Sequence, residues 1–386
     1  MRQIILAILV LLVSVNAYAV TCTGTNPEIC VSKICGVGDN CTDEDFNTLS
    51  TWVTTRLAVE DDFVTATKIE KAEVYDDDGY IVDRVDIIGA TTNENYYWIV
   101  TAPAGERHDG TAPDGTDGDG AVIDCGTTRE TCVDLSDQYT KWEWVSVERK
   151  SESGCCRDAV ALSGSYTAYH HTITFSEVNP GIFTFGIGVR ASPAYVYRNI
   201  IHGFYSGESN CITGAGGDNS TIAYNNTCFG TDIGYAAAHL DGVWQNNISA
   251  DCLQKDFAQM YTSHQKYNWT RDATADNSSG PSGDSVEFNI STDTSGWDDV
   301  VFLSPSTSVF LLGDNTASDL SPYNSGDAIS PIANAPDLDV GIRGNTVFDG
   351  FWDIGADEYG ASEVFISQLT IGGSLAIDTH LTIGSE

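Results

Sequence analysis

Four asparagines recur at one constant interval, and a period of this kind leaves few folds open to the chain. The strings "YNNTC", "QNNIS", "KYNWT" and "EFNIS" contain, in order, Asn226, Asn247, Asn268 and Asn289. Their period of about 21 residues falls in the range of roughly 20 to 50 that is typical of solenoids, in which each repeat forms one coil. The residues around each asparagine are β-branched, aromatic or turn-forming, so we expect every coil to consist of β-strands.

The series continues toward the N-terminus with a longer spacing. Asn199 in "YRNII" precedes Asn226, and Thr172 in "HHTIT" precedes Asn199, each by an interval six positions longer than the later one. A longer loop in these coils explains the six additional residues. We expect the asparagines to stack at the same turn of successive coils, because asparagine tolerates left-handed backbone angles and its amide can bond to the amides above and below.

Some of these strings are also glycosylation sequons, for example Asn247-Ile248-Ser249. Two interpretations are open. The sequons were selected as glycosylation sites, or they arise because a structural asparagine precedes a small or apolar residue and then Ser or Thr. The constant register favours the structural interpretation, although in a eukaryotic source some sequons could still be glycosylated.

Coils of about 21 residues with an asparagine ladder resemble the right-handed parallel β-helix, the pectate-lyase-like fold of secreted polysaccharide lyases, glycoside hydrolases, phage tailspikes and bacterial surface proteins. Within residues 336–360, the string "DIGADE" from Asp353 to Glu358 is similar to the "DIGAxE" ending of many secreted bacterial and metagenomic β-helix proteins. The resemblance covers residues 46–360. It implies an all-β, right-handed parallel β-helix with rungs of about 21 residues, and it implies no particular activity.

The first 19 residues have the three parts of a secretory signal peptide. A charged start at Arg2 precedes an apolar run, and Ala17-Tyr18-Ala19 supplies a small-x-small cleavage pattern. A membrane anchor is the alternative, but a bilayer span needs about 20 apolar residues and this run becomes polar at Asn16. We therefore predict cleavage after Ala19 and a secreted, extracellular or cell-surface protein whose mature chain has no membrane span.

The mature chain divides into a Cys-rich N-terminal segment (residues 20–45), the β-helix (residues 46–360) and a C-terminal tail (residues 361–386). At the start of the second part, Phe46, Leu49, Val53 and Leu57 recur at helical spacing. This pattern predicts an amphipathic helix that caps the open end of the solenoid.

The tail contains three six-residue copies, "LTIGGS", "LAIDTH" and "LTIGSE". Such a short apolar ladder cannot bury itself alone. It either covers the last coil as a pair of strands or serves as an attachment strand, through which the chain could form a homo-oligomer.

All eleven cysteines follow the predicted cleavage site, which favours disulfides in an oxidising compartment. The sequence has no repeated CxxC or histidine spacing that would favour zinc. Because eleven is an odd number, at least one thiol must stay outside the intrachain disulfides or pair between chains.

The charge of the chain excludes two classes of partner. The 55 acidic and 18 basic residues give a formal net charge of −37. A surface of this sign repels nucleic acid and anionic lipid, so we expect neither as a partner.

Short catalytic motifs such as GxSxG, HExxH, the P-loop and GxGxxG do not occur in the sequence. Counting residues from the ladder asparagine of each coil suggests instead one cluster of ionisable side chains from two neighbouring coils. His239 and Asp241 lie two residues apart on one strand face, and His264 falls nearby in the next coil, about 4.8 Å away. These three are candidate catalytic residues, because an aspartate beside an imidazole supports general acid or base chemistry. The alternative is a polar surface patch without chemistry.

A glycine-rich loop at residues 108–120 concentrates four aspartates, Asp109, Asp114, Asp117 and Asp119. Carboxylates on a chain that can curl around a hard cation suggest a Ca²⁺ site, although the spacing is not that of an EF-hand. The alternative is a solvated acidic loop. We predict no other cofactor.

Tryptophans are the candidate carbohydrate-binding residues. Trp98 follows two tyrosines, and Trp142 and Trp144 have the spacing of two that places side chains on one face of a strand. Exposed indoles could stack on sugar rings, whereas buried indoles would belong to the core. The sequence leaves both alternatives open.

These observations predict a protein that contacts a polysaccharide or a cell-surface glycan through its lateral face, with binding favoured over depolymerisation. An enzyme would be a polysaccharide lyase or a glycoside hydrolase. Because Arg190, Lys255, Lys266 and Arg271 fall at unrelated offsets in their coils, no basic stripe forms, which favours a neutral glycan or an acidic one bridged by calcium. The alternative function is a non-catalytic adhesin, a tailspike-like protein or a filament subunit.

Overall fold

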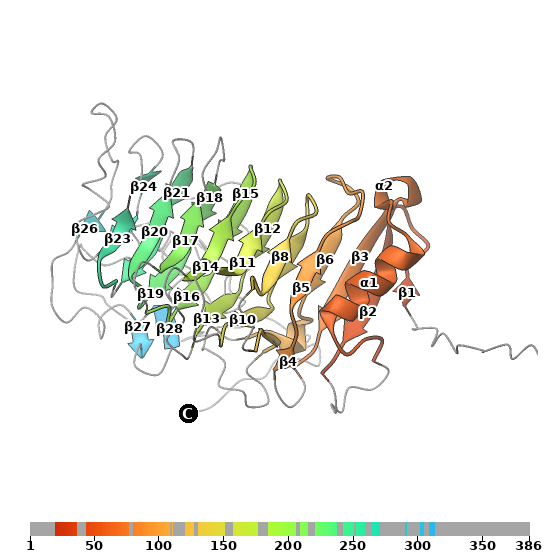
Figure 1. Cartoon of the computed structure of the whole chain (residues 1–386), viewed down its shortest axis with the longest axis horizontal. Helices are drawn as coiled ribbons and strands as arrows, with labels where there is room; N and C mark the ends of the chain where they lie inside the picture. The colour runs from red at the N-terminus through yellow and green to blue at the C-terminus, as the bar shows by residue number, and fades with distance from the viewer. Residues whose placement is uncertain are drawn as a thin grey trace, which may run out of the picture.

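The chain forms a parallel β-helix, in which successive strands stack along one long axis (Figure 1). This computed structural model describes residues 20–36, 44–76, 80–108, 110, 120–126, 130–150, 157–176, 184–205, 209–214, 221–237, 242–250, 252–258, 265–266, 268–270, 290–291, 302–304 and 309–312. The predicted signal peptide, the "DIGADE" string and the C-terminal tail lie outside these residues. No helix among the described residues is long and apolar enough to cross a membrane.

Three sheets form the faces of the β-helix, and their neighbouring strands are parallel apart from the β1–β2 pair. The first sheet contains β1 (Thr21–Cys22), β2 (Glu28–Ile34), β3 (Lys68–Val74), β6 (Trp98–Thr101), β9 (Lys141–Glu143), β12 (Thr167–His170), β15 (Ala194–Tyr197), β18 (Thr221–Tyr224), β21 (Val243–Gln245) and β24 (Gln265–Lys266). The second sheet contains β4 (Ile81–Val82), β7 (Val122–Asp124), β10 (Ser146–Glu148), β13 (Ile173–Phe175), β16 (Ile200–His202), β19 (Thr227–Phe229), β22 (Ile248–Ala250), β25 (Trp269–Thr270) and β26 (Ile290–Ser291). The third sheet contains β5 (Val85–Ile87), β8 (Val133–Leu135), β11 (Arg157–Leu162), β14 (Thr184–Val189), β17 (Asn210–Gly214), β20 (Ile233–Ala237) and β23 (Lys255–Ala258).

One strand from each sheet makes a rung, and the rungs differ in length. The ladder asparagines of successive rungs are 27 residues apart from Asn199 to Asn226 and 21 residues apart from Asn226 to Asn247. The shorter rung predicted from the sequence therefore applies to the later part of the β-helix. Earlier rungs are longer because longer connections separate their strands; Val100 of β6 and Trp142 of β9 are direct neighbours although they lie far apart in the sequence.

The interior of the β-helix is filled by one side of each strand. Alternate residues of a strand point to opposite faces, and in the first sheet the inward positions carry fully buried side chains. These residues stack in register from rung to rung: Val100, Trp142, Tyr169, Val196, Ala223 and Trp244. The outward positions of the same strands point away from this core, although His170 and Tyr224 among them are buried.

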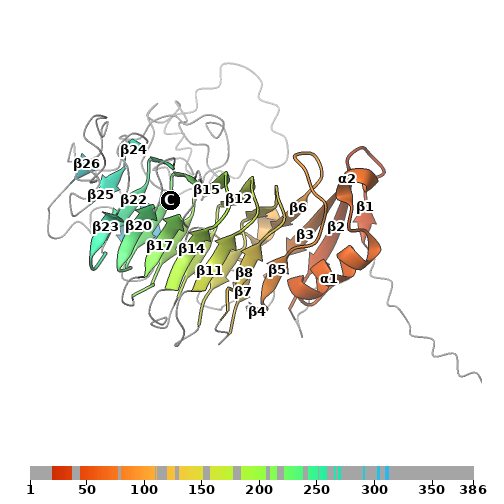
Figure 2. The same ribbon diagram turned by 45° about the horizontal axis from the view of Figure 1, so that its top comes forward.

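The N-terminal end is closed by helix α1 (Leu49–Val59), as the sequence predicts (Figure 2). The first sheet extends to β2, whereas the second and third sheets end at β4 and β5, and α1 packs against β5 where further strands would lie. Thr48 caps the helix by accepting a hydrogen bond from Thr51 N. Leu49 and Val53 are buried as expected, and Leu57 is half-buried.

The same end holds a buried ion pair that ties the helix to the first sheet. Arg56 of α1 donates from Nη2 to Glu70 Oε1 at 2.6 Å and from Nε to Glu70 Oε2 at 2.9 Å. Burial raises the pKa of Glu70, and the Arg56 guanidinium opposes that shift. A second short helix, α2 (Phe63–Ala66), leads into β3, and the remaining elements are η1 (Ala104–Glu106) and the hairpin of β27 (Phe302–Ser304) with β28 (Val309–Leu312).

The disulfides agree with the prediction for an oxidising compartment. Among the described residues, the structure contains Cys22–Cys30, Cys125–Cys132 and Cys211–Cys228, while Cys252 carries a thiol whose pKa is raised by burial. The first disulfide joins β1 to β2. Because these strands belong to the first sheet, the sheet begins within the segment that the sequence separates as Cys-rich.

Candidate functional site

The turn between the first and second sheets is built from two residues that repeat in each rung. The first adopts a left-handed conformation, with φ values of 56° at Arg198, 54° at Asn225 and 52° at Asn246. The second is the ladder asparagine, for example Asn226 or Asn247. Asparagine is one of the few residues that tolerate left-handed angles, which explains the "NN" pairs in the sequence.

The ladder asparagines are joined by side-chain hydrogen bonds. Nδ2 of Asn199 donates to Oδ1 of Asn226, Nδ2 of Asn226 donates to Oδ1 of Asn247, and Nδ2 of Asn247 donates to Oδ1 of Asn268, each at 3.0 Å. Thr172 begins the series by donating from Oγ1 to Asn199 Oδ1 at 3.0 Å. The last asparagine of the series, Asn289, lies outside the described residues.

This geometry separates the two interpretations of the sequons. Asn247 and Asn268 are fully buried, and their side-chain amides are bonded within the ladder. Glycosylation requires an accessible amide nitrogen. In the folded protein these two asparagines are therefore structural residues.

Two groups of predicted site residues lie outside the part of the chain that the structure describes. They are the candidate catalytic residues His239, Asp241 and His264, and the candidate calcium ligands Asp109, Asp114, Asp117 and Asp119. Both sites remain predictions from the sequence.

The three candidate sugar-binding tryptophans are buried, which favours the core alternative. Trp98 donates from Nε1 to Asp137 Oδ2 at 2.9 Å, and Trp142 donates from Nε1 to Val145 O at 2.8 Å. Trp144 lies outside a strand, at a turn position with φ of 62°. The turn breaks the alternation, so the spacing of two does not give Trp142 and Trp144 a common exposed face.

Instead, tyrosines gather on the outer face of the first sheet and at its edge. We name this surface the tyrosine face; it consists of Tyr139, Tyr166, Tyr195, Tyr197 and Tyr224. Tyr195 and Tyr197 occupy the outward positions of β15, and Tyr224 follows Tyr197 in register on β18. Tyr139 and Tyr166 occupy equivalent turns of two successive rungs, both with φ of 60°. The strands of this sheet lie side by side and are stacked one after another along the axis (Figures 1 and 2).

The aromatic rings of this face stack from rung to rung. The ring centroids of Tyr139 and Tyr166 are 4.7 Å apart and their planes differ by 5°. Tyr197 lies between His170, at 4.4 Å, and Tyr224, at 5.3 Å. Burial raises the pKa of Tyr224 to about 12 and also raises the pKa of Tyr197. The phenols therefore keep their protons at neutral pH and can both donate and accept hydrogen bonds.

Two histidines beside this face form a hydrogen-bonded chain with a fixed direction. Arg198 Nη1 lies 3.2 Å from His171 Nε2, and because a guanidinium can only donate, this nitrogen of His171 accepts. In a neutral His171 the proton is then on Nδ1, which lies 2.7 Å from His170 Nδ1. His170 accepts there and carries its own proton on Nε2, which lies 3.4 Å from Glu143 Oε2.

Because of this hydrogen-bonded chain, neither His170 nor His171 is suited to act as a base. Both ring nitrogens of His170 and of His171 already have partners. Burial, together with the charges of Arg198 and Lys141, lowers the pKa of His170 to about 3. An efficient general base has a pKa close to the working pH, so this cluster positions side chains rather than transfers protons at neutral pH.

Charged residues lie at the N-terminal side of the tyrosine face. Lys141 of β9 contacts Tyr97 twice, with Nζ 2.8 Å from the phenol oxygen and 4.4 Å from the ring centroid. Glu143, two residues later on the same strand face, is partly exposed. This ammonium and carboxylate mark the boundary between the charged and uncharged parts of the outer face.

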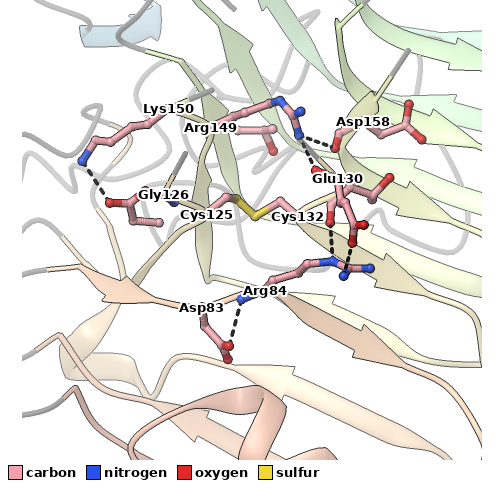
Figure 3. The surroundings of a disulfide bond; sticks show 12 residues. Asp83, Arg84, Cys125, Gly126, Glu130, Cys132, Arg149, Lys150 and Asp158 are labelled. Atoms are coloured by element: carbon pink, nitrogen blue, oxygen red, sulfur yellow. Dashed lines mark hydrogen bonds and ion pairs between the residues drawn. A yellow bond between two sulfur atoms is a disulfide. The ribbon is translucent and has the colours of Figure 1, made fainter. Parts of the chain in front are cut away.

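A second polar cluster surrounds the disulfide Cys125–Cys132 (Figure 3). Arg149 Nη1 donates to the main-chain oxygens of Glu130 and Asp158, both at 3.0 Å. Arg84 donates from Nε to Thr131 O at 3.1 Å and forms an ion pair with Glu130. These contacts join three successive rungs, so the cluster holds the corner between the second and third sheets together.

Asp158 is the buried carboxylate of this cluster. It forms an ion pair with Arg190, yet burial outweighs the nearby positive charges and raises its pKa to about 6. A Cβ atom at Gly188 would collide with the Asp158 carboxyl, so glycine is needed opposite this side chain. The close packing leaves no room for a ligand between these two residues.

The sequence does contain a sign of the tyrosine face, namely equal intervals between tyrosines. Counting residues from the ladder asparagines alone does not reveal it. The interval between Tyr139 and Tyr166 is the same as the interval between Tyr197 and Tyr224. It also equals the interval from Asn199 to Asn226. Extending the rung count to every aromatic residue would have placed these tyrosines in columns.

No protein-family model matches the sequence, and no curated protein does either. Among solved structures, the chain is similar to the crystal structure of pectate lyase Pel9A, with a TM-score of 0.29 and 15% sequence identity. The alignment covers 86% of this chain and 97% of that chain. A TM-score of this size supports no argument about function, and the β-helix assignment follows from the three parallel sheets themselves.

Proposed function

We propose that the chain is an extracellular protein that binds a glycan along the tyrosine face, and that binding, not depolymerisation, is its activity. The observation that carries the proposal is the repetition of phenol groups on one outer face in successive rungs. Neighbouring strands are about 4.8 Å apart, so these groups follow one another along the β-helix axis as a row of two columns, Tyr139 with Tyr166 at the sheet edge and Tyr197 with Tyr224 on the strands. A linear polymer with repeated hydroxyl groups is matched to such a row.

The chemistry of the row suits sugars. A protonated phenol can donate to one sugar hydroxyl and accept from another, and aromatic side chains lose little conformational entropy when they bind. Ile222 lies beside Tyr195 and Tyr224 on the same face and offers apolar contact to the C–H groups of a sugar ring. The stacked rings cover one another's faces, so hydrogen bonding contributes more than ring stacking does.

Binding is favoured over cleavage by the state of the ionisable groups near this face. Hydrolysis of a glycosidic bond uses two carboxyl groups that flank it, and elimination needs a base together with a cation that neutralises the substrate. Among the described residues, the carboxylates near the tyrosine face are Glu143, which faces His170, and Glu94, which acts electrostatically on Tyr139. Both imidazoles are committed to the hydrogen-bonded chain that starts at Arg198. If the protein does cleave glycans, His239, Asp241 and His264 are the residues that we propose for it.

The test is retention of the pure protein on immobilised glycans, with and without Ca²⁺, while new reducing ends and unsaturated products are followed. Tyr195→Ala and Tyr197→Phe should each weaken retention several-fold. Tyr205→Ala is the matched control, because Tyr205 is also exposed, at 39%, but lies after β16 of the second sheet.

Three other results would change the assignment. Equal retention of all three variants would exclude the tyrosine face as the binding surface. Turnover that is lost in folded His239→Ala and Asp241→Ala variants would establish an enzyme. Failure to bind any glycan would favour the adhesin, tailspike-like or filament alternative.

A further inference from the structure

We infer that the glycan recognised by the tyrosine face is uncharged, an inference that rests on the proposed function and names its substrate class. Its basis is a stretch of the first sheet in which no outward side chain carries a charge at neutral pH. The outward residues of β12, β15, β18 and β21 are, in order, Ala168 and His170, Tyr195 and Tyr197, Ile222 and Tyr224, and Val243 and Gln245.

This stretch contrasts with the acidic composition of the chain and with the strand that precedes it in the sheet. Charged residues make up 19% of the chain and give it a net charge of −37, and the strand before the stretch carries Lys141 and Glu143 on the same face. The only titratable imidazole within the stretch, His170, is kept neutral by its burial and by the nearby positive charges of Arg198 and Lys141, and one of its nitrogens accepts from His171. Four successive strands of this sheet therefore have uncharged outward positions, as do β13, β16, β19 and β22 of the second sheet.

A polyanionic glycan would find no partner on this surface. Recognition of a carboxylate or sulfate normally uses Arg or Lys, and the outward positions of these four strands have neither. The strongly negative chain also repels a polyanion over longer distances. An uncharged glycan avoids both costs, and the side chains offer it phenol hydroxyls, the Gln245 amide and the apolar surfaces of Ile222 and Val243.

The test compares retention on a neutral hexose polymer, a uronic acid polymer and a sulfated polymer, at low and high NaCl and with and without Ca²⁺. We expect retention on the neutral polymer alone. It should change less than twofold between about 0.05 and 0.5 M NaCl, because screening by salt affects charged contacts only. Preferential retention on either acidic polymer, with or without Ca²⁺, would overturn the inference and leave glycan binding itself intact.

A variant adds a gain-of-function test. Ile222→Lys places one cation in the uncharged stretch, and its aliphatic stem can keep the apolar contacts of the isoleucine. The variant should acquire salt-sensitive retention on the uronic acid polymer, at least severalfold above the wild-type level. Retention identical to that of the wild type would contradict the placement of the glycan on this face. Failure of the wild type to bind any polymer would overturn the proposed function and this inference together.

Discussion

Replacing Asn247 with alanine should lower the free energy of unfolding by about 3 kcal/mol. Oδ1 of Asn247 accepts from the backbone N–H and from Nδ2 of Asn226, and its Nδ2 donates to Ala223 O and to Asn268 Oδ1, all at 3.0 Å. Alanine removes these four hydrogen bonds inside a fully buried turn. The two donors of Asn226 lose this acceptor, and a buried group without its partner costs about 1 to 3 kcal/mol.

Urea denaturation followed by circular dichroism measures this change. Asn95→Ala is the control, because the Asn95 side chain is exposed and its loss should change stability by less than about 0.5 kcal/mol. Asn247→Asp keeps the acceptor oxygens but loses the donors and brings a charge toward Asn268 Oδ1, so it should stabilise the protein no better than alanine does. Equal midpoints for Asn247→Ala and Asn95→Ala would refute the energetic role of the ladder.

Three further predictions concern processing and pH. Secreted protein should begin at Val20, and mass spectrometry that finds Met1 on exported material would contradict the signal peptide. Because burial raises the pKa of Asp158 from 3.8 to about 6, the folded protein binds a proton that the unfolded chain lacks, so the free energy of unfolding should fall as pH rises from about 4 to 6. Asp158→Asn should flatten that slope in denaturation experiments, and identical slopes would count against the assignment. Because the pKa of His170 is lowered to about 3, its nitrogen NMR shifts should report a neutral ring at about pH 5, and a protonated ring there would disprove the hydrogen-bond directions given above.

The fold could be predicted from the sequence because the repeat of the asparagines is short enough to be seen in the sequence, and because the chemistry of asparagine explains the repeat. Asn226 and Asn247 recur where each rung turns from the first to the second sheet, because their amides bond to the next rung. Only a few residue types tolerate the left-handed angles of the preceding residues, Asn225 and Asn246. The capping helix was predictable for a similar reason, since Leu49 and Val53 mark one face of a helix. Rung length was less predictable, because loops between strands can grow without disturbing the register of the strands.

The candidate site was harder to predict because exposure depends on the conformation of single residues. Trp142 and Trp144 have strand spacing, but the left-handed turn at Trp144 sends the two indoles to different surroundings. Trp98 is buried between aromatic rings at the helix-capped end, 4.9 Å from Trp52 and 4.5 Å from Phe63. Hydrophobic size alone does not distinguish these positions from an exposed binding surface.

The central claim, that a glycan binds along the tyrosine face, is tested most directly by a crystal structure of the protein with a neutral oligosaccharide that it retains. The account predicts sugar density on the outer face of β12, β15 and β18, with sugar hydroxyls within hydrogen-bonding distance, about 3 Å, of the phenol oxygens of Tyr195 and Tyr197. Sugar bound instead on the second or third sheet, with the tyrosine face unoccupied, would contradict it.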